Sequence, residues 1–302
     1  MNASEKNMEK TFKSGFVNII GRPNTGKSTF LNAMLRYPLA ITTPKAQTTR
    51  HRILGIDNGE DYQIIYSDTP GIIKPAYELQ KYMMDAVREA LEDADVLLLM
   101  VTPGEENNTD ETLTEYLSNV KVPILVLLNK IDTATQEQVE KAVQYWEEKL
   151  PGAQVLPISA LHGFGLDQVR NRILDLLPEA PPYFDRHQLT DRPERFLVSE
   201  KIREKILKHF KKEIPYSVEV VVEEFKETED RIRIRAIIYV ERDSQKGIII
   251  GHRGSGLKRI GTEARKELEQ LFGKKIFLEL YVKVRKNWRK DEQWLKRFGY
   301  KK

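Results

Sequence analysis

Short, almost continuous apolar runs alternate with amphipathic stretches through the first half of the chain. The runs are Phe16–Ile20, Val96–Val101, Ile124–Leu128 and Val155–Ile158. Between them, stretches such as Thr135–Leu150 and Leu166–Leu177 repeat apolar residues with helical spacing. Strands that are apolar throughout are typical of a parallel sheet covered by helices on both faces. The pattern predicts an α/β domain with a mostly parallel sheet, and Asn58-Gly59 predicts a hairpin between Arg52–Asp57 and Tyr62–Ser67.

The second half follows a different order of elements. Phe196–Phe210 and Ser255–Phe272 carry helical apolar stripes, whereas three other segments alternate with the period of a strand. These strand segments are Tyr216–Phe225, Arg231–Arg235 and Ile276–Val284. With a further helix before Gly251, the order is helix, strand, strand, helix, helix, strand, which predicts a small α+β domain.

Prolines mark the boundary between the two patterns. Three of the five residues 178–182 are prolines, which end a helix and stiffen a linker. We therefore expect a flexible tail at 1–14, a first domain at 15–178, a linker at 179–195 and a second domain at 196–302, including a C-terminal tail.

Composition narrows the possible chemistry. The 302 residues are 31% charged and 40% hydrophobic, as in soluble globular proteins. The lack of cysteine excludes disulfides, thiol nucleophiles and thiolate metal sites, and fits a reducing compartment. Met1–Gly15 is too polar for a signal peptide and Val96–Val101 is too short to span a bilayer, so we expect a cytoplasmic protein.

Charge differs sharply between the two halves. Residues 1–180 carry 18 Lys and Arg against 25 Asp and Glu, whereas residues 181–302 carry 31 against 20. A basic domain joined to an acidic one suggests a polyanionic partner for the basic half. A well-solvated surface is the alternative, and composition does not decide between them.

The segment Gly21–Ser28 matches the phosphate-binding pattern G-x-x-x-x-G-K-[ST] and lies between an apolar strand and a helix. Backbone N–H groups in such a loop surround phosphate oxygens, Lys27 adds a charge, and Ser28 offers a hydroxyl to Mg²⁺. A chance glycine turn is the alternative. The residues predicted to bind nucleotide here are Gly21, Arg22, Pro23, Asn24, Thr25, Gly26, Lys27, Ser28 and Thr29.

Three further motifs follow strand ends, where open α/β sheets bind ligands. In Asn129-Lys130-Ile131-Asp132, the Asp132 carboxylate can accept two N–H groups of guanine while the Lys130 stem covers the base; a helix cap is the alternative. In Asp68-Thr69-Pro70-Gly71, Asp68 can hold Mg²⁺ and the Gly71 N–H can contact the γ-phosphate; a simple turn is the alternative. The third motif is Ser159-Ala160-Leu161, whose N–H groups would contact guanine O6.

Together these motifs resemble those of translation-factor-like small GTPases and, more narrowly, the Era family. Pro44–Arg52 is similar to the Era switch I, which implies a threonine that reaches Mg²⁺ and the γ-phosphate; we assign Thr49, with Thr48 as the second choice. The P-loop Asn24 implies a bound K⁺. Ile72 stands where Ras-like enzymes place a glutamine, so we expect slow intrinsic turnover. The predicted catalytic residues are Asn24, Lys27, Thr49 and Gly71.

Gly251-His252-Arg253-Gly254 lies between two predicted helices of the basic half. Such a loop lets a nucleic-acid backbone approach the main chain, as in KH domains, and the order of elements resembles the type II arrangement. A tight helix–helix turn is the alternative. The predicted RNA-binding residues are Lys246, Ile250, Gly251, His252, Arg253, Gly254, Lys258 and Arg259.

Two other basic segments have simpler explanations. We expect Arg231, Arg233 and Arg235 to pair with Glu219 and Glu223 across strands rather than to bind RNA. The aromatic and basic tail 288–300 resembles the Era C-terminus; it could stack on bases or dock its aromatic side chains on the domain core.

The resemblance covers residues 16–300 and implies a GTPase that converts GTP to GDP, binds the 3′ end of small-subunit ribosomal RNA and acts on the 30S subunit as a monomer. Two alternatives remain. One is a membrane-associated GTPase in cell-cycle control, peripheral on the inner face of the cell membrane. The other is a constitutive RNA-binding protein with a structural nucleotide.

Overall fold

The computed structural model of the protein describes residues 11–105, 111–118 and 120–300. Contacts within the chain define two units. The first comprises Met1–Tyr37, Ile53–Thr69 and Arg88–Asp191, and the second comprises Pro38–Arg52, Pro70–Val87 and Arg192–Lys302. Two segments that the sequence placed in the first domain, 38–52 and 70–87, therefore belong to the second unit by their contacts.

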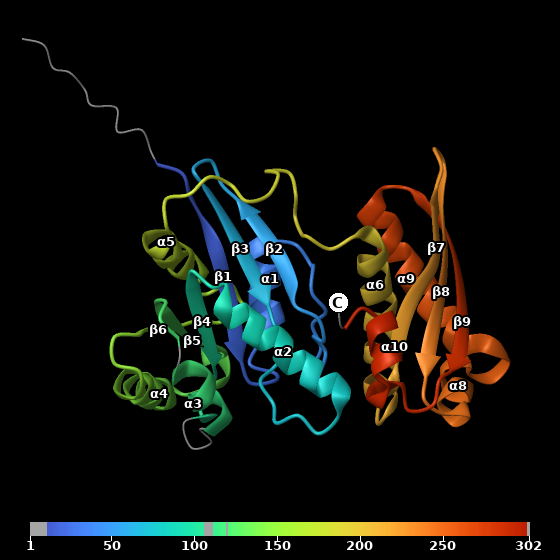
Figure 1. The fold of residues 1–302 in the computed structure, drawn as a ribbon, viewed down its shortest axis with the longest axis horizontal. Helices are drawn as coiled ribbons and strands as arrows, with labels where there is room; N and C mark the ends of the chain where they lie inside the picture. Colours follow the sequence, from blue (N-terminus) through green and yellow to red (C-terminus); the bar gives the residue numbers. More distant parts are fainter. Residues whose placement is uncertain (1–10, 106–110, 119, 301–302) are drawn as a thin grey trace, which may run out of the picture. The chain divides into compact units, whose positions relative to one another are not determined.

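A six-stranded sheet forms the centre of the first unit, in the order β2-β3-β1-β4-β5-β6 (Figure 1). Its strands are β1 (Lys13–Gly21), β2 (Ile53–Asn58), β3 (Tyr62–Asp68), β4 (Val96–Val101), β5 (Ile124–Leu128) and β6 (Gln154–Pro157). Only the β2–β3 pair is antiparallel, which confirms the hairpin and the mostly parallel sheet. β1 begins inside the predicted tail, because Lys13 and Ser14 pair with β3.

Helices follow the strands as the apolar pattern predicts. They are α1 (Lys27–Leu35), α2 (Glu78–Glu92), α3 (Glu111–Ser118), α4 (Gln136–Lys149) and α5 (Leu166–Leu176), with a 3-10 turn η2 (Ile131–Thr133). α1 packs against β1, β2 and β3, and α4 packs against β5 and β6. Thr135 and Gln138 form a capping box that fixes the start of α4, and Ala142 and Trp146 of this helix are buried.

The second unit contains a three-stranded sheet in the order β7-β8-β9, with β7 antiparallel and β9 parallel to β8. The strands are β7 (Glu219–Glu227), β8 (Arg231–Val240) and β9 (Lys275–Val284). The helices are α6 (Glu194–His209), α7 (Ile214–Ser217), α8 (Asp243–Ile250), α9 (Ser255–Phe272) and α10 (Glu292–Arg297), with 3-10 turns η3 (His252–Gly254) and η4 (Trp288–Lys290). The predicted order of the main elements is confirmed.

α6 and α9 pack together and lie on one face of this sheet (Figure 1). Apolar residues of both helices and of alternate strand positions form a continuous buried cluster, among them Ile202, Ile234 and Leu268. The predicted strand at Tyr216 begins later, at Glu219, because α7 occupies 214–217 with Pro215 in its first turn.

The predicted partners of the β8 arginines are wrong in detail. A register shift between Val222 and Glu224 places Glu224, and not Glu223, opposite Arg235. Arg233 and Arg235 therefore approach Glu224 and Glu279, at N–O distances of 3.1 to 3.9 Å. Glu219 lies farther along the ladder, opposite Tyr239.

The C-terminal tail docks on the sheet, as one of its two interpretations predicted. Trp288 and Leu295 are fully buried, and the rings of Trp294 and Phe298 lie 5.5 and 5.2 Å from that of Tyr239. Asp291 caps α10 by accepting from the N–H groups of its first turn. Among the described residues, none of the helices is both long and apolar enough to cross a membrane.

Candidate nucleotide site and nucleic-acid interface

The predicted phosphate-binding loop joins β1 to α1 at the carboxyl edge of the sheet. Gly21 and Gly26 have φ values of 150° and 101°, and a Cβ on either would lie 2.3 Å from a neighbouring atom, Met100 O or Asn129 Nδ2. Both positions therefore require glycine. Asn24, with φ of 66°, is a left-handed non-glycine residue in the same loop. The strand order reverses beside β1, which is the usual ligand position in such sheets.

Lys27 is buried beneath this loop. Its Nζ donates to the carbonyl oxygens of Gly21 at 3.0 Å and Arg22 at 2.7 Å. Burial lowers the pKa of Lys27 from 10.5 to about 8, although Asp68 and Glu105 act in the opposite direction. An added anion would stabilise the charged form, so the loop is suited to phosphate.

Ser28 and Asp68 lie together beside the loop. The Ser28 hydroxyl donates to Asp68 Oδ2 at 2.7 Å, and Asp68 is fully buried at the end of β3. A hydroxyl and a carboxylate oxygen are ligands that Mg²⁺ accepts, together with phosphate oxygens. The next residue, Thr69, is also buried and donates to Ile19 O at 2.6 Å.

Asn129 connects the three loops of the predicted base site. Its Nδ2 donates to Thr25 O at 2.8 Å, and its Oδ1 accepts from the Ala160 N–H at 2.9 Å. Lys130 Nζ donates to Asn24 O at 2.5 Å. The structure therefore brings the P-loop, the Asn129–Asp132 motif and the Ser159–Leu161 motif to one place.

Asp132 is oriented by its neighbours. Ser159 Oγ donates to Asp132 Oδ1 at 2.5 Å, and this hydrogen bond lowers the pKa of Asp132. His162 Nε2 lies 3.7 Å from Oδ2; the sequence analysis did not select this residue, because a single histidine in a loop carries no pattern. Leu161 is 73% exposed beside the motif, so its side chain is available to a ligand.

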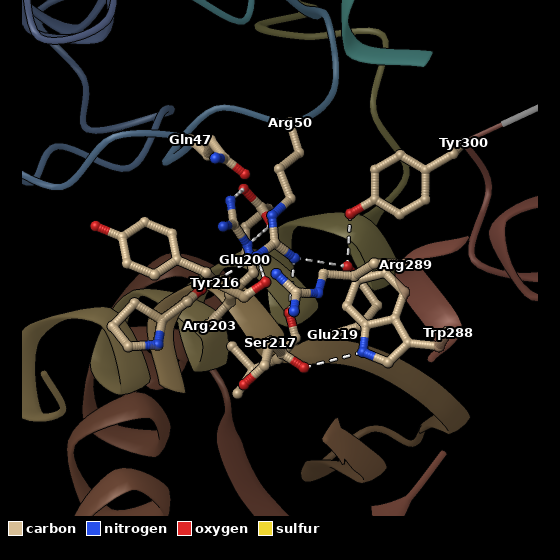
Figure 2. A network of polar contacts seen from close by, with 12 residues as sticks. Gln47, Arg50, Glu200, Arg203, Tyr216, Ser217, Glu219, Trp288, Arg289 and Tyr300 are labelled. Atoms are coloured by element: carbon tan, nitrogen blue, oxygen red, sulfur yellow. Dashed lines mark hydrogen bonds and ion pairs between the residues drawn. The ribbon is translucent and has the colours of Figure 1, made fainter. Parts of the chain in front are cut away.

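The predicted switch I belongs to the second unit, where its side chains are held by a polar network (Figure 2). Arg50 is buried and its guanidinium donates to the carbonyl oxygens of Pro215, Tyr216 and Val218 at 2.6 to 3.2 Å. Arg50 Nη1 also lies 3.1 Å from Glu219 Oε2. Such a fork uses the donor geometry that distinguishes arginine from lysine.

Other members of the network hold the same segment. Arg203 of α6 donates to Thr48 O at 2.5 Å and pairs with Glu200 at 2.7 Å. Tyr300 donates to Glu219 at 2.5 Å, and its ring stacks on His51 at 4.3 Å. Burial raises the pKa of Glu219, and burial beside three arginines lowers the pKa of His51.

Thr48 and Thr49 differ within this segment. The Thr48 hydroxyl donates to Lys45 O at 2.6 Å and lies 2.7 Å from Thr43 Oγ1, and the side chain is buried. Thr49 is half-buried. After the Asp68–Gly71 motif, Ile72 is buried and belongs to the second unit together with Pro70 and Gly71.

The Gly-x-x-Gly loop joins α8 to α9 as predicted. Gly251 and Gly254 have φ values of 72° and 79°, and a Cβ on Gly251 would lie 2.8 Å from Gly256 N. His252 and Arg253 are exposed, and Arg253 is also left-handed, with φ of 50°. The loop therefore exposes the side chains of His252 and Arg253. Its main chain turns so tightly that only glycine fits at position 251.

A groove of about 440 Å³ lies beside this loop. It has an apolar floor with two cations, Lys258 and Arg265. Its lining residues are Gly254, Leu257, Lys258, Gly261, Thr262, Arg265, Ile276, Phe277, Leu278 and Leu280.

Of the predicted RNA residues, Gly254 and Lys258 line the groove, and Arg259 instead pairs with Glu263 at 3.2 Å. Thr262, Arg265 and Phe277 also line the groove, although they were not predicted to bind RNA from the sequence. Helical spacing carries the missing signal for α9, because residues 254, 258, 261, 262 and 265 recur on one face.

Comparisons with known proteins match both domains of the chain. A family described as "KH domain" matches residues 213–289, and one described as "50S ribosome-binding GTPase" matches residues 16–130. The GTPase Era of Staphylococcus epidermidis is 46% identical over 290 residues, which are 95% of this chain and 97% of that protein. The chain belongs to the Era family of GTPases.

Two solved Era structures share the fold of this family member over 96% of its chain and 99% of theirs, each with 38% identity and a TM-score of 0.92. One holds MgGDPNP and nucleotides 1506–1542 of 16S ribosomal RNA, and the other, from Aquifex aeolicus, holds GDP and AlF₄⁻. The predicted family, the P-loop GTPase fold with a C-terminal KH domain, and GTPase activity are confirmed.

Proposed function

We propose that this Era-family GTPase is a GTP-driven switch that binds the 3′ end of small-subunit ribosomal RNA and assists assembly of the small ribosomal subunit. One observation carries the proposal: a phosphate-binding loop and a Gly-x-x-Gly loop beside a basic, apolar groove occur in one chain. The Era structure that holds a GTP analogue and 16S ribosomal RNA supports both ligands.

We assign the nucleotide to the residues that Asn129 gathers at the carboxyl edge of the first sheet. They are Gly21–Thr29, Asp68–Ile72, Asn129–Asp132 and Ser159–Leu161. Lys27 would contact the β- and γ-phosphates, and its lowered pKa supports an anionic ligand. Asp132, ionised and oriented by Ser159, would accept the two guanine N–H groups.

Mg²⁺ would be held by Ser28, Asp68 and Thr49, together with phosphate oxygens. When bound, it would neutralise charge on the phosphates during transfer of the γ-phosphoryl group to water. The Ser28–Asp68 contact supports the first two ligands. We assign Thr49 rather than Thr48 on the resemblance of this segment to the Era switch I; the Thr48 hydroxyl contacts Thr43 and Lys45.

We also propose a K⁺ site at Asn24, supported by the resemblance of the P-loop and by the absence of a glutamine at Ile72. Turnover of the wild-type protein should be faster in potassium than in sodium buffer, and Asn24→Ala should remove the difference. Equal turnover of the wild-type protein in both salts would contradict the K⁺ site.

The RNA would lie against the Gly-x-x-Gly loop and in the neighbouring groove. Lys246, His252, Arg253, Lys258 and Arg265 would face phosphates, while Ile250 and the apolar floor would contact bases. The charge excess of residues 181–302 supports a polyanionic ligand. Cytoplasmic location, the monomeric state and contact with the membrane stay predictions.

Replacing His252 and Arg253 by aspartates tests the RNA assignment. The variant should lose binding of 16S 3′-end RNA, because two carboxylates would face phosphates, and it should keep GTP binding. Arg186→Asp with His187→Asp is the matched control, since it makes the same pair of changes at exposed positions of the linker.

Circular dichroism verifies that both variants fold. If the folded His252/Arg253 variant binds the RNA with wild-type affinity, the loop is not the RNA contact.

A further inference from the structure

The solvent face of the β8–β9 pair carries exposed aromatic and basic side chains that the groove does not account for. Phe277 and Tyr281 are 53% and 48% exposed and point to the same face of β9, since they are four residues apart in a strand. Few large apolar side chains of the described residues are as exposed as these two. Because both lie on one strand, they form a small exposed apolar patch.

The partners across the strand pair are mostly cations. Arg233 lies opposite Phe277, with its guanidinium 5.7 Å from the ring centroid, and Ile237 lies opposite Tyr281. Arg235 lies opposite Glu279 between these two rungs. Both guanidinium groups form ion pairs with Glu224 and Glu279, at N–O distances of 3.1 to 3.9 Å.

The end of the same face carries two cations in direct opposition. Arg231 lies opposite Lys275 in the β8–β9 ladder, and both side chains are exposed. Neither has a carboxylate partner among the salt bridges of the described residues. Like charges placed directly opposite destabilise a sheet, and a polyanion on this face would relieve that repulsion.

This face of the sheet meets the groove at Phe277, and the C-terminal tail covers its other end. Phe277 lines the groove beside α9 and also lies on the solvent face of β9. At the far end, the C-terminal tail covers Tyr239 with Trp294 and Phe298. A strand of nucleic acid that leaves the groove at Phe277 can therefore continue over Tyr281.

We propose that this face, formed by Arg231, Arg233, Lys275, Phe277 and Tyr281, is a second binding surface for single-stranded RNA. Bases stack on the two rings while the cations contact phosphates, which is how sheet surfaces bind single strands. The rings are separated by four residues of β9, or about 13 Å. The inference rests on the proposed RNA function and extends the bound strand beyond the groove.

Dissociation constants for a length series of 16S 3′-end oligonucleotides test this surface. The series runs from a short strand that fills only the groove to nucleotides 1506–1542. Tyr281→Ala should leave the short strand unaffected and weaken the longer ones about 5- to 150-fold, the range for loss of one stacked base. Tyr281→Phe should retain binding, and Tyr183→Ala removes an equally exposed tyrosine elsewhere as a control.

A second variant tests the cations. Arg231→Ala with Lys275→Ala should make the affinity for long strands less dependent on salt, because fewer phosphates are then neutralised by the protein. The slope should become shallower by about 0.7 for each such phosphate. Lys141→Ala with Lys149→Ala, two exposed positions of α4, removes the same charge as a control.

The outcomes separate this surface from the proposed function. If the wild-type protein binds none of the strands, the RNA function itself fails. If the wild-type protein binds the strands, and both Tyr281→Ala and the Arg231/Lys275 variant bind every length with wild-type affinity, the face does not bind RNA. A partner of another class would then have to be sought for it. Equal weakening of all lengths, including the shortest, would also contradict the proposal, because the effect would then lie in the groove.

Discussion

At the scale of single residues, the pKa values and hydrogen bonds of Lys27 and Asp132 suit the ligands that we propose for them. Lys27 is the clearest case, because burial lowers its pKa to about 8 and, among the described residues, its Nζ donates to two main-chain carbonyls. A lysine in that state is better stabilised with a phosphate beside it than without one. The same reasoning applies to Asp132, whose ionised form is favoured by the Ser159 hydroxyl before any base is present.

Nucleotide binding should therefore take up a proton at alkaline pH. Between about 8 and 10.5, Lys27 is largely neutral in the folded protein, and phosphate would restore its charge. Affinity should fall as pH rises through about 8, and the stability of the nucleotide-free protein should rise from there toward 10.5, since the unfolded lysine binds more protons.

Calorimetry in two buffers with different ionisation enthalpies measures this uptake. At about pH 9 the observed heats should differ between the buffers, and at about pH 7, where Lys27 is already charged, the difference should vanish. Identical heats at the higher pH would show that Lys27 does not change its protonation on binding.

At the scale of elements, the segment 38–52 is the least expected part of the structure. Its motif predicted a role at the nucleotide, yet its contacts lie in the second unit, where Arg50 donates to the carbonyl oxygens of α7 and of Val218 after it. Glu219 and Tyr300 complete the network from β7 and the tail (Figure 2). In the sequence, the segment thus lies between two parts of the first unit, whereas its contacts are with the second unit.

Arg50→Ala should destabilise the second unit by about 3–5 kcal/mol, because it leaves a buried carboxylate without its partner. Arg50→Lys keeps the charge but not the fork, so its destabilising effect should be smaller. Urea unfolding monitored by amide exchange in α6 and β7 gives both values. If Arg50→Ala unfolds at the wild-type urea concentration, the network does not stabilise the unit.

Sequence patterns predicted these elements well and the side-chain partners poorly. The P-loop and the Gly-x-x-Gly loop depend on local spacing and on glycines with positive φ, and the β2–β3 hairpin depends on two strand patterns close together in the sequence. The partners of Arg233 and Arg235 depend on a one-residue bulge after Val222, and no local pattern shows it. The exposure of Tyr281 depends on where the tail stops on the sheet, which only the packing of Tyr239 reveals.

At the scale of the whole molecule, the proposed function requires that nucleotide binding and RNA binding affect each other. Of the proposed nucleotide residues, Lys27, Asp68 and Asp132 belong by their contacts to the first unit, and Thr49 and Gly71 belong to the second. The segments 38–52 and 70–87, which carry Thr49 and Gly71, have their contacts in the unit that carries the proposed RNA groove. Linkage requires the converse effect of RNA on nucleotide affinity, by the same factor.

The most direct test of this account is the affinity of the wild-type protein for nucleotides 1506–1542 of 16S ribosomal RNA with a GTP analogue, with GDP and without nucleotide. The account predicts that affinity differs between the GTP analogue and GDP, by about 5- to 150-fold as is typical of coupled sites, and that RNA changes the affinity for the analogue equally. Equal RNA affinity in all three states would contradict a switch and would favour a constitutive RNA-binding protein with a structural nucleotide.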